Sequence, residues 1–414
     1  MPLRRIAVIG SGISGLSAAY YLSRAGEVTM FEKDARMGGH THTVMVGQTP
    51  IDTGFIVHND KTYPNFCRLM VELGVQTHAS DMSFGVRSES GDFEYSSRGL
   101  GGFFAQRSNL LRPSHYMLFK EILRFNREGP KFLRERSDES GVTLGEFLEA
   151  GRYQQIFIER YLYPMASAVW SMAPQDMAGF PALTLLRFFD NHGMLGISTH
   201  PQWKTLKGGS HSYFEPLTKP FRERIHTGVN IRSVVRHADG VRLLFENHTA
   251  EFDEVVFACH GNQILPLLAD ATAQERDVLQ HFETSRNEAV LHTDVRMLPR
   301  REAARASWNY CLSRDGGVNL TYDMNRLQSL TGDVNYCVSL NAASGAIAPE
   351  RVIRKMIYHH PLYTRAAVDA QARWHEVSGQ NRTHFCGAYW FYGFHEDGVR
   401  SALRVASALG VNVA

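Results

Sequence analysis

Three glycines near the amino terminus have the spacing of a phosphate-binding turn. Gly10, Gly12 and Gly15 follow the apolar run of residues 6–9 and open a segment, residues 18–22, with helical character. In such a turn the first glycine allows the tight bend, the second lets the backbone approach a phosphate, and the third lets the helix pack on the strand. The helix N-terminus carries about half a positive elementary charge and would face the phosphates.

An acidic residue occupies the position at which a dinucleotide-binding turn needs a hydrogen-bond acceptor for the ribose hydroxyls. Glu32 ends a second predicted strand, about twenty residues after the glycines. Its carboxylate is expected to accept hydrogen bonds from ribose hydroxyls, and its charge would repel a 2′-phosphate, which disfavours NADP. A chance glycine turn would explain the glycines alone, but the strand, helix and spaced acid together predict a dinucleotide site.

A glycine pair extends this surface. Residues 32–39 read Glu-Lys-Asp-Ala-Arg-Met-Gly-Gly, and His40 follows. This pattern resembles the FAD-binding motif of the amine-oxidase and phytoene-desaturase-like flavoproteins, in which Arg or Lys often follows the glycine pair. The resemblance implies FAD as the cofactor and contacts to it from Ser11, Lys33 and Arg36.

The carboxyl-terminal region contains a second motif of strand, aromatic loop and helix. The predicted strand ends at Gly387, the loop reaches Gly393, and a helix over residues 398–409 follows. The resemblance implies that this helix N-terminus faces the FAD diphosphate and ribitol, and that Glu396 or Asp397 binds ribitol or orders the loop. The alternative is that Asp397 caps the helix.

Two internal segments also resemble parts of the FAD site. Thr53, Gly54 and Phe55 are similar to the segment along the isoalloxazine edge, and Val229 is similar to the position that presents backbone to adenine; an ordinary core strand residue is the alternative for Val229. The complete predicted cofactor set is Gly10, Ser11, Gly12, Gly15, Glu32, Lys33, Arg36, Gly38, Gly39, Thr53, Gly54, Phe55, Val229, Gly387, Gly393, Glu396, Asp397 and Val399.

The composition of the chain limits its possible partners, its location and the role of its cysteines. The chain has 414 residues, 43% hydrophobic and 21% charged, with a net charge of +2, so nothing indicates a nucleic acid partner. It has no apolar run of about eighteen residues, and its first strand begins at once, so we expect a cytoplasmic protein. Five cysteines without a CxxC spacing predict reduced thiols and no metal site.

The order of elements predicts an α/β fold with two interleaved domains. Residues 1–75, 205–285 and 375–414 are assigned to a Rossmann-type FAD-binding domain. Residues 76–204 and 286–374 are assigned to an α+β substrate domain with a mixed sheet and a helical insert. Expected elements are strands at 41–46, 50–57, 225–258 and 286–345, a helix at 63–74, a hairpin at 83–95 and helices over 114–195.

The substrate side is less defined. Amine and polyamine oxidases, by the resemblance, place a Lys near flavin N5, but no Lys occurs between Lys219 and Lys355. The predicted catalytic candidates are Asn309, Tyr310, Tyr322 and His58. The pair before Pro361, His359 and His360, fits a helix end better than a catalytic pair.

The helical insert is rich in Phe, Tyr, Met and Leu, and can be core or the wall of an apolar tunnel. Residues 52–60 and 393–398 look like a bacterial group within the superfamily, similar to the N-terminal oxidoreductase-like region of plant cyclopropane fatty acid synthases. That resemblance implies oxidation or desaturation of a fatty-acyl substrate by hydride transfer to flavin N5. An amine or polyamine oxidase, and a flavin-bearing non-catalytic partner of a lipid methyltransferase, are the alternatives.

A lipid-bound substrate would require peripheral contact with the inner face of the membrane, and a lipid-modifying enzyme is an expected partner. The insert has a basic face that suits this contact. The basic face consists of Arg107, Arg112, Lys120, Arg124, Arg127 and Lys131. The alternative is that these side chains form an ordinary solvated helix surface.

Overall fold

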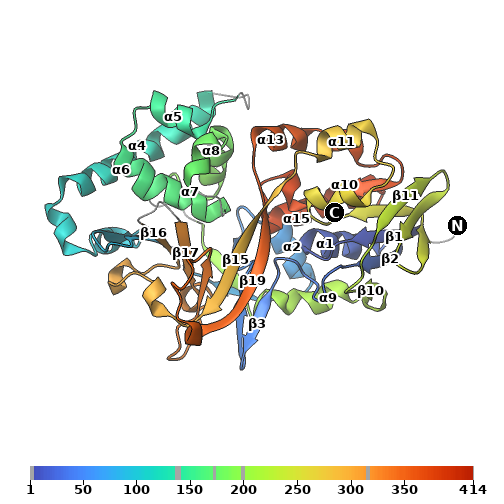
Figure 1. Cartoon of the computed structure of the whole chain (residues 1–414), viewed down its shortest axis with the longest axis horizontal. Coiled ribbons are helices and arrows are strands. Elements are labelled where there is room, and N and C mark those ends of the chain that lie inside the picture. The colour runs from blue at the N-terminus through green and yellow to red at the C-terminus, as the bar shows by residue number, and fades with distance from the viewer. Residues whose placement is uncertain (1–3, 136–140, 171–173, 197–200, 314–317, 414) are drawn as a thin grey trace.

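The computed structural model describes residues 4–135, 141–170, 174–196, 201–313 and 318–413. Figure 1 shows a parallel sheet beside the two chain termini and a second sheet with a helical insert on the opposite side. The α/β fold predicted from the sequence is confirmed.

The parallel sheet is assembled from distant parts of the chain. Its central strand β1 (Arg4–Ile9) pairs in parallel with β2 (Gly26–Phe31) and β14 (Glu254–Phe257), and the outer strands are β10 (Ile225–His226) and β20 (Thr383–Phe385). Residues 6–9 of β1 are all buried, as expected for a parallel strand covered on both faces.

Two helices from opposite ends of the chain lie against each other beside this sheet (Figure 1). They are α1 (Ile13–Leu22) and α15 (His395–Ala408). Gly398 allows their close approach, because a Cβ there would lie 2.6 Å from Cγ2 of Ile13. The last helix begins three residues before the predicted start.

The second sheet is mixed and contains the longest strands. β16 and β7 run parallel, and the other neighbours are antiparallel. In spatial order the strands of the described part are β19 (Val352–Pro361), β15 (Thr284–His292), β18 (Cys337–Leu340), β17 (Val318–Asp323), β16 (Trp308–Leu312), β7 (Phe84–Ser88) and β8 (Glu94–Ser96). The predicted helix end at His359 and His360 is wrong, because both residues pair with β15 inside strand β19.

The insert is helical, as predicted. Its helices include α3 (Gly99–Phe103), α4 (Pro113–Glu135), α5 (Leu144–Ala150), α6 (Gln155–Phe157), a π-helical turn (Ile158–Leu162), α7 (Tyr163–Trp170) and α8 (Ala182–Asn191). The capping box at the start of α5 joins Thr143 and Glu146 through both of its hydrogen bonds.

Further short elements lie outside the two large sheets. They are β3 (Thr43–Val46), β4 (Thr49–Asp52), β5 (His58–Asn59), α2 (Pro64–Glu72), β6 (Thr77–Ala79), β9 (Trp203–Leu206), β11 (Ser233–His237), β12 (Gly240–Leu244) and β13 (Thr249–Phe252). The strand predicted over residues 50–57 ends at Asp52. Beyond it the chain turns, and Gly54 packs so closely on the carbonyl of His40 that a side chain would overlap it.

The strands of each sheet come from the segments assigned to the corresponding domain, but the boundaries between the domains stay a prediction. Within the described residues, no helix is both long and apolar enough to cross a bilayer. The five cysteines, all in described residues, are free thiols.

Candidate cofactor and substrate site

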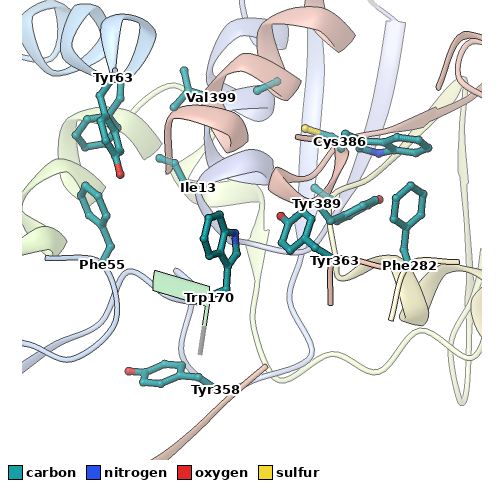
Figure 2. Packing of buried hydrophobic residues seen from close by; sticks show 14 of the residues in the cluster. Ile13, Phe55, Tyr63, Trp170, Phe282, Tyr358, Tyr363, Cys386, Tyr389 and Val399 are labelled. Carbon is teal, nitrogen blue, oxygen red and sulfur yellow. The ribbon is translucent and has the colours of Figure 1, made fainter. Parts of the chain in front are cut away.

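A cavity of about 1230 Å³ lies between the parallel sheet, strand β19 and the helical insert. Four aromatic residues labelled in Figure 2, Phe55, Trp170, Tyr358 and Tyr363, come from different parts of the chain, and all four line the cavity. One part of its wall carries the glycine motif, and another part, which we call the apolar arm, is formed mostly by apolar side chains of the insert.

The three glycines of the first turn have separate roles. Gly10 has φ +105°, and a Cβ there would lie 2.8 Å from the backbone of Ala258 and Cys259. A Cβ on Gly15 would overlap the carbonyl oxygen of Gly10, so Gly15 serves helix packing. A Cβ on Gly12 would meet nothing within 4 Å, because Gly12 borders the cavity. Gly12 is also the N-cap residue of α1, and it has no side chain that could accept hydrogen bonds from the first backbone N–H groups of the helix. Those N–H groups are therefore available to bind an anion.

Glu32 is held in place by the turn it faces. Its Oε2 accepts hydrogen bonds from the backbone N (2.9 Å) and Oγ (2.6 Å) of Ser11, and its Oε1 accepts one from the backbone N of Asp34 (3.0 Å). The backbone N of Val229 donates to the carbonyl of Glu32 at 3.0 Å. Glu32, Lys33 and Val229 therefore lie together on the cavity wall.

Arg36 braces the glycine pair. Its guanidinium donates to the carbonyls of Met37 and Thr41 at 2.9 Å and to that of Gly39 at 2.6 Å. This arrangement brings Gly39 next to Gly12, since a Cβ on Gly39 would lie 3.3 Å from Cα of Gly12. Arg36 and Gly39 line the cavity.

The acids of the carboxyl-terminal motif act on helix ends. Glu396 accepts hydrogen bonds from the backbone N and Nδ2 of Asn65 and from the backbone N of Phe66, which caps α2. Oδ2 of Asp397 accepts one from the backbone N of Phe394 at 2.9 Å, which caps α15. Burial raises the pKa of Asp397 to about 7. Phe394, and not Asp397, is the N-cap residue of α15, and Asp397 acts on it from the third position of the capping box. Neither carboxylate is among the described residues that line the cavity, and a contact with ribitol stays a prediction.

The predicted cofactor residues thus divide into two groups. Those on the cavity wall are Gly10, Ser11, Gly12, Glu32, Lys33, Arg36, Gly39, Gly54, Phe55, Val229, Gly387 and Gly393. Those behind the wall are Gly15, Gly38, Thr53, Glu396, Asp397 and Val399. Thr53, for example, bonds the carbonyl of His42 and the hydroxyl of Tyr358. These six support the wall but do not reach the cavity.

Of the four predicted catalytic residues, Tyr322 lines the cavity. Asn309 instead bonds the backbone of Ala306 and Thr321, which closes a turn beside β16. Tyr310 is buried between the sheet and α7, and His58 is enclosed by Phe55, Tyr63 and Phe66. Asn309, Tyr310 and His58 are not among the described residues that line the cavity, and a catalytic role for them stays a prediction.

A group of histidines lines another part of the cavity wall. The ring of His40 lies 5.0 Å from that of His360, 6.0 Å from that of His260 and 5.1 Å from that of Tyr358, centroid to centroid. Burial lowers the pKa of His260 and His360 to about 4 and that of His40 well below its usual range, so these rings are neutral at pH 7. His359 lies beside His260. No group of three or more His, Cys, Asp or Glu side chains in the described residues has a metal-binding arrangement.

A chain of hydrogen bonds determines which nitrogen of His360 carries the proton. The backbone N of Glu288 donates to Oδ1 of Asn341 (3.1 Å), so Nδ2 of Asn341 is the atom that donates to Oδ1 of Asn287 (2.7 Å). Nδ2 of Asn287 then donates to Nδ1 of His360 (2.9 Å). Because Nδ1 accepts, the neutral ring carries its proton on Nε2.

The second arm of the cavity is apolar. Aromatic, Met and Val side chains form most of its wall, with His192 among them. Its lining residues include Met82, Phe84, Tyr161, Met165, Val169, Trp170, Phe188, His192, Met194, Trp203, Trp308 and Tyr322. Lys33, on the cofactor wall, is the one lysine among the described residues that line the cavity.

His192 is the one histidine among the described lining residues of this arm. Its ring stacks on Phe188, with centroids 3.8 Å apart, and lies 5.9 Å from the ring of Trp203. Nδ1 lies 2.8 Å from the carbonyl oxygen of Phe188, which only accepts, so Nδ1 carries the proton and Nε2 keeps a lone pair. Burial lowers the pKa of His192 to about 4.

Comparison with known proteins identifies the family. The family model of the flavin-containing amine oxidoreductases matches residues 13–296, more than half of the chain. The chain belongs to this family. It is therefore an FAD-dependent oxidoreductase, and FAD is the cofactor for which the glycine wall is built.

Curated relatives match over short stretches. Protoporphyrinogen oxidase 2 of Arabidopsis thaliana is 56% identical over 43 residues, 10% of this chain and 8% of the relative. Coproporphyrinogen III oxidase of Mycobacterium tuberculosis (strain H37Rv) is 37% identical over 82 residues, 18% of this chain and 17% of the relative. The chain thus matches less than a fifth of either relative's length.

Solved flavoenzymes of the same fold match along almost the whole chain. Wild-type putrescine oxidase bound to putrescine has a TM-score of 0.71, and cyclohexylamine oxidase from Brevibacterium oxydans has 0.70. A fatty acid isomerase from P. acnes that produces CLA has 0.69. Each is 14% identical and covers 99% of both chains, which shows the fold and not the substrate. None of the proteins named here is a cyclopropane fatty acid synthase, so that resemblance has no support from these matches.

Proposed function

We propose that this oxidoreductase desaturates the acyl chain of a lipid-bound fatty acid, with FAD as the two-electron acceptor. The observation that carries the proposal is the apolar arm, which leaves the FAD wall and is lined by Trp170, Phe188 and other side chains of the insert. Such a lining suits an alkyl chain, which needs no ionic partner. The absence of a lysine from the described lining of this arm also separates the site from an amine oxidase.

The residues on the cofactor wall fit FAD. The diphosphate would lie at Gly12, where a Cβ would have open space, and Glu32 would meet the adenosine ribose. Nε2 of His40 is buried and has no hydrogen-bond partner among the described residues, as expected of an atom that faces a ligand. FAD bound here would supply the redox chemistry.

Desaturation removes a hydride and a proton from adjacent carbons, and the electron pair left by the proton forms the C=C bond. The hydride would go to flavin N5. We assign the proton to Nε2 of His192, whose lone pair is kept free by the bond between Nδ1 and the carbonyl of Phe188. Tyr322 lies on the same arm and would help to position the acyl chain. Turnover then needs an external two-electron acceptor, such as a quinone or dioxygen.

An amine oxidase is the second candidate because one carboxylate lies on the cavity wall outside the cofactor motif. Asp81 accepts hydrogen bonds from the backbone N of Ser83 (2.8 Å) and Oγ of Ser307 (2.9 Å). Burial alone would raise the pKa of Asp81, but the hydrogen bonds from Ser83 and Ser307 outweigh it and lower the pKa. Asp81 is therefore ionised and could bind an ammonium group.

The test is product analysis with purified, FAD-loaded protein. Phospholipids with monounsaturated or methyl-branched acyl chains are incubated with the protein and a quinone, and the extracted lipids are measured by mass spectrometry. We expect an acyl chain that has lost two hydrogens. Peroxide release with putrescine or cyclohexylamine and unchanged lipids would replace this proposal with an amine oxidase. Unchanged lipids and amines, with a lipid methyltransferase that co-purifies, would favour the non-catalytic partner.

A further inference from the structure

Exposed apolar side chains are concentrated in one short part of the insert. Six of the twelve large apolar side chains that are exposed in the described residues lie between positions 100 and 123. They are Leu100 (67% exposed), Leu110 (50%), Leu111 (88%), Tyr116 (49%), Met117 (41%) and Leu123 (38%). Scattered exposed leucines are ordinary, but a group of this kind marks an interaction surface. We call these six side chains the docking patch.

The docking patch is surrounded by positive charge. Residues 98–120 contain Arg98, Arg107, Arg112 and Lys120 and no Asp or Glu. Arg107 and Lys120 form no ion pair with any described residue. The rest of the predicted basic face is different: Arg124 pairs with Glu128 at 3.0 Å, and Lys131 lies 3.7 Å from Glu135. The basic surface is therefore shorter than predicted and coincides with the apolar side chains.

Helix α4 presents one face of mixed apolar and basic character. Tyr116, Lys120, Leu123 and Arg127 are exposed and follow helical spacing, while Leu118 and Phe125 are buried on the opposite face. The ring of Phe104 lies 5.6 Å from that of Tyr116, which connects the end of α3 with the start of α4. Apolar side chains flanked by Lys and Arg are typical of helices that lie at the surface of a bilayer.

One member of the docking patch, Leu100, lies close in the chain to a residue of the cavity wall. Ser97 lines the cavity and exchanges hydrogen bonds with Phe84, which lines the arm. Leu100 stands three residues further along, on α3. In Figure 1, α4 lies on the side of the molecule away from the marked chain termini. If the docking patch held this side of the molecule against a bilayer, the apolar arm would lie close to membrane lipid.

We propose that the docking patch binds the surface of an anionic phospholipid bilayer, with its leucines among the acyl chains and its arginine and lysine side chains at the headgroups. This inference extends the proposed function, since it supplies the route by which a lipid-bound acyl chain reaches the arm. It concerns binding and not turnover, so it can be tested separately.

The test is co-sedimentation of the full, FAD-loaded chain with lipid vesicles. We expect binding to vesicles of phosphatidylglycerol and phosphatidylcholine, and weaker binding to phosphatidylcholine alone or at high salt. The double substitution Leu110→Asp and Leu111→Asp should lower the partition coefficient by about tenfold or more. The double substitution Arg107→Glu and Lys120→Glu should remove the preference for the anionic vesicles.

Val71→Asp is the matched control, because Val71 is 81% exposed on α2, outside the docking patch. It should bind like the unmodified protein. Equal vesicle binding by the unmodified protein and the leucine variant would overturn the proposal. So would a dimer, seen by ultracentrifugation without lipid, that the leucine variant loses, because a second copy would then cover the patch. Vesicle binding without acyl oxidation would refute the proposed substrate and leave this inference standing.

Discussion

The imidazole of His395 lies face to face with the ring of Phe55, with centroids 3.6 Å apart and an angle of 9° between the planes. Nε2 of His395 lies 3.0 Å from Oγ1 of Thr41. This stack joins the start of α15 to the turn after β4, and both rings line the cavity. The FAD wall is therefore complete only when the two ends of the chain have come together.

Alanine substitutions at Gly12 and Gly15 should have different effects, the first on FAD affinity and the second on the stability of the fold. Gly12→Ala adds a methyl group in open space at the cavity, so the free energy of unfolding of the apoprotein should stay within about 0.5 kcal/mol. FAD affinity should fall about tenfold or more, equivalent to a loss of about 1.4 kcal/mol. Gly15→Ala, which overlaps the carbonyl of Gly10, should destabilise the apoprotein by about 1–3 kcal/mol. Urea denaturation and FAD titration measure the two effects, and equal destabilisation by both substitutions would refute the assignment.

Asp397 should make stability depend on pH. Its pKa of about 7 in the folded protein lies above the ordinary value of 3.8, so between these values the folded state binds more protons than the unfolded state. The contribution of Asp397 to the free energy of unfolding therefore falls as pH rises towards 7, by up to about 1.4 kcal/mol per pH unit. The free energy of unfolding of Asp397→Asn relative to that of the unmodified protein should therefore rise as pH rises towards 7 and stay constant above it.

Urea denaturation of both proteins at a series of pH values measures this difference. Asn keeps an oxygen that can accept from the backbone N of Phe394, so the cap is retained. Asp333→Asn, at an exposed position, controls for the loss of one negative charge. A difference that does not change with pH would contradict the buried, partly protonated carboxyl.

Asn287 should hold His360 as the tautomer with its proton on Nε2. In protein labelled with ¹⁵N-histidine, the NMR signals of His360, assigned by their loss in His360→Gln, should show an unprotonated Nδ1 at neutral pH. Asn287→Asp replaces the donor with a carboxylate that accepts, so the pKa of His360 should rise from about 4. Asn287→Leu should release Nδ1 and mix the two tautomers.

The rings that face His360 from other elements are His40 and His260, and His359 is its neighbour on β19. Their signals serve as internal references in the same titration. Asn325→Asp, which contacts the backbone of Val334 and Tyr336, is the control. A proton on Nδ1 of His360 in the unmodified protein would contradict the hydrogen-bond chain.

His192 should matter for oxidation and not for FAD binding. His192→Phe keeps the stack on Phe188 and removes the lone pair of Nε2, so the rate of flavin reduction by an acyl lipid should fall about 10²–10⁴-fold. Stopped-flow absorbance measures this rate, and FAD titration should give an unchanged dissociation constant. His58→Phe is the control, because position 58 lies behind the cavity wall, and its flavin should be reduced by the lipid at the same rate as in the unmodified protein. Equal rates for all three proteins would assign the proton to another acceptor.

Much of the cofactor wall could be predicted from the sequence because its signals are local. Gly10, Gly12 and Glu32 act through the backbone geometry of one strand, turn and helix, which spacing reveals. Asp397 is harder to interpret, because a helix cap and a ligand contact use the same residue type at a helix start, and only the hydrogen bond from Phe394 in the folded chain identifies the cap. The helical insert and the mixed sheet were also predictable in kind from their periodicity.

The substrate side could not be predicted because it depends on long-range packing. The sequence predicts a helix end at His359 and His360, but pairing of β19 with β15 places them on the cavity. Trp308 lines the cavity, but its neighbours Asn309 and Tyr310 do not, because Asn309 bonds the backbone of Ala306 and Thr321 and Tyr310 packs against α7. Neither His192 nor Asn287 stands in a motif: His192 follows Asp190 and Asn191, and Asn287 lies between Arg286 and Glu288, so nothing in the local sequence singles them out.

The most direct test of the central claim is the absorbance of the bound flavin after anaerobic addition of a phospholipid with a monounsaturated or methyl-branched acyl chain. We expect the oxidised flavin band to bleach, and to bleach far more slowly in His192→Phe. A flavin that stays oxidised with every acyl lipid, but is bleached by putrescine or cyclohexylamine, would contradict it.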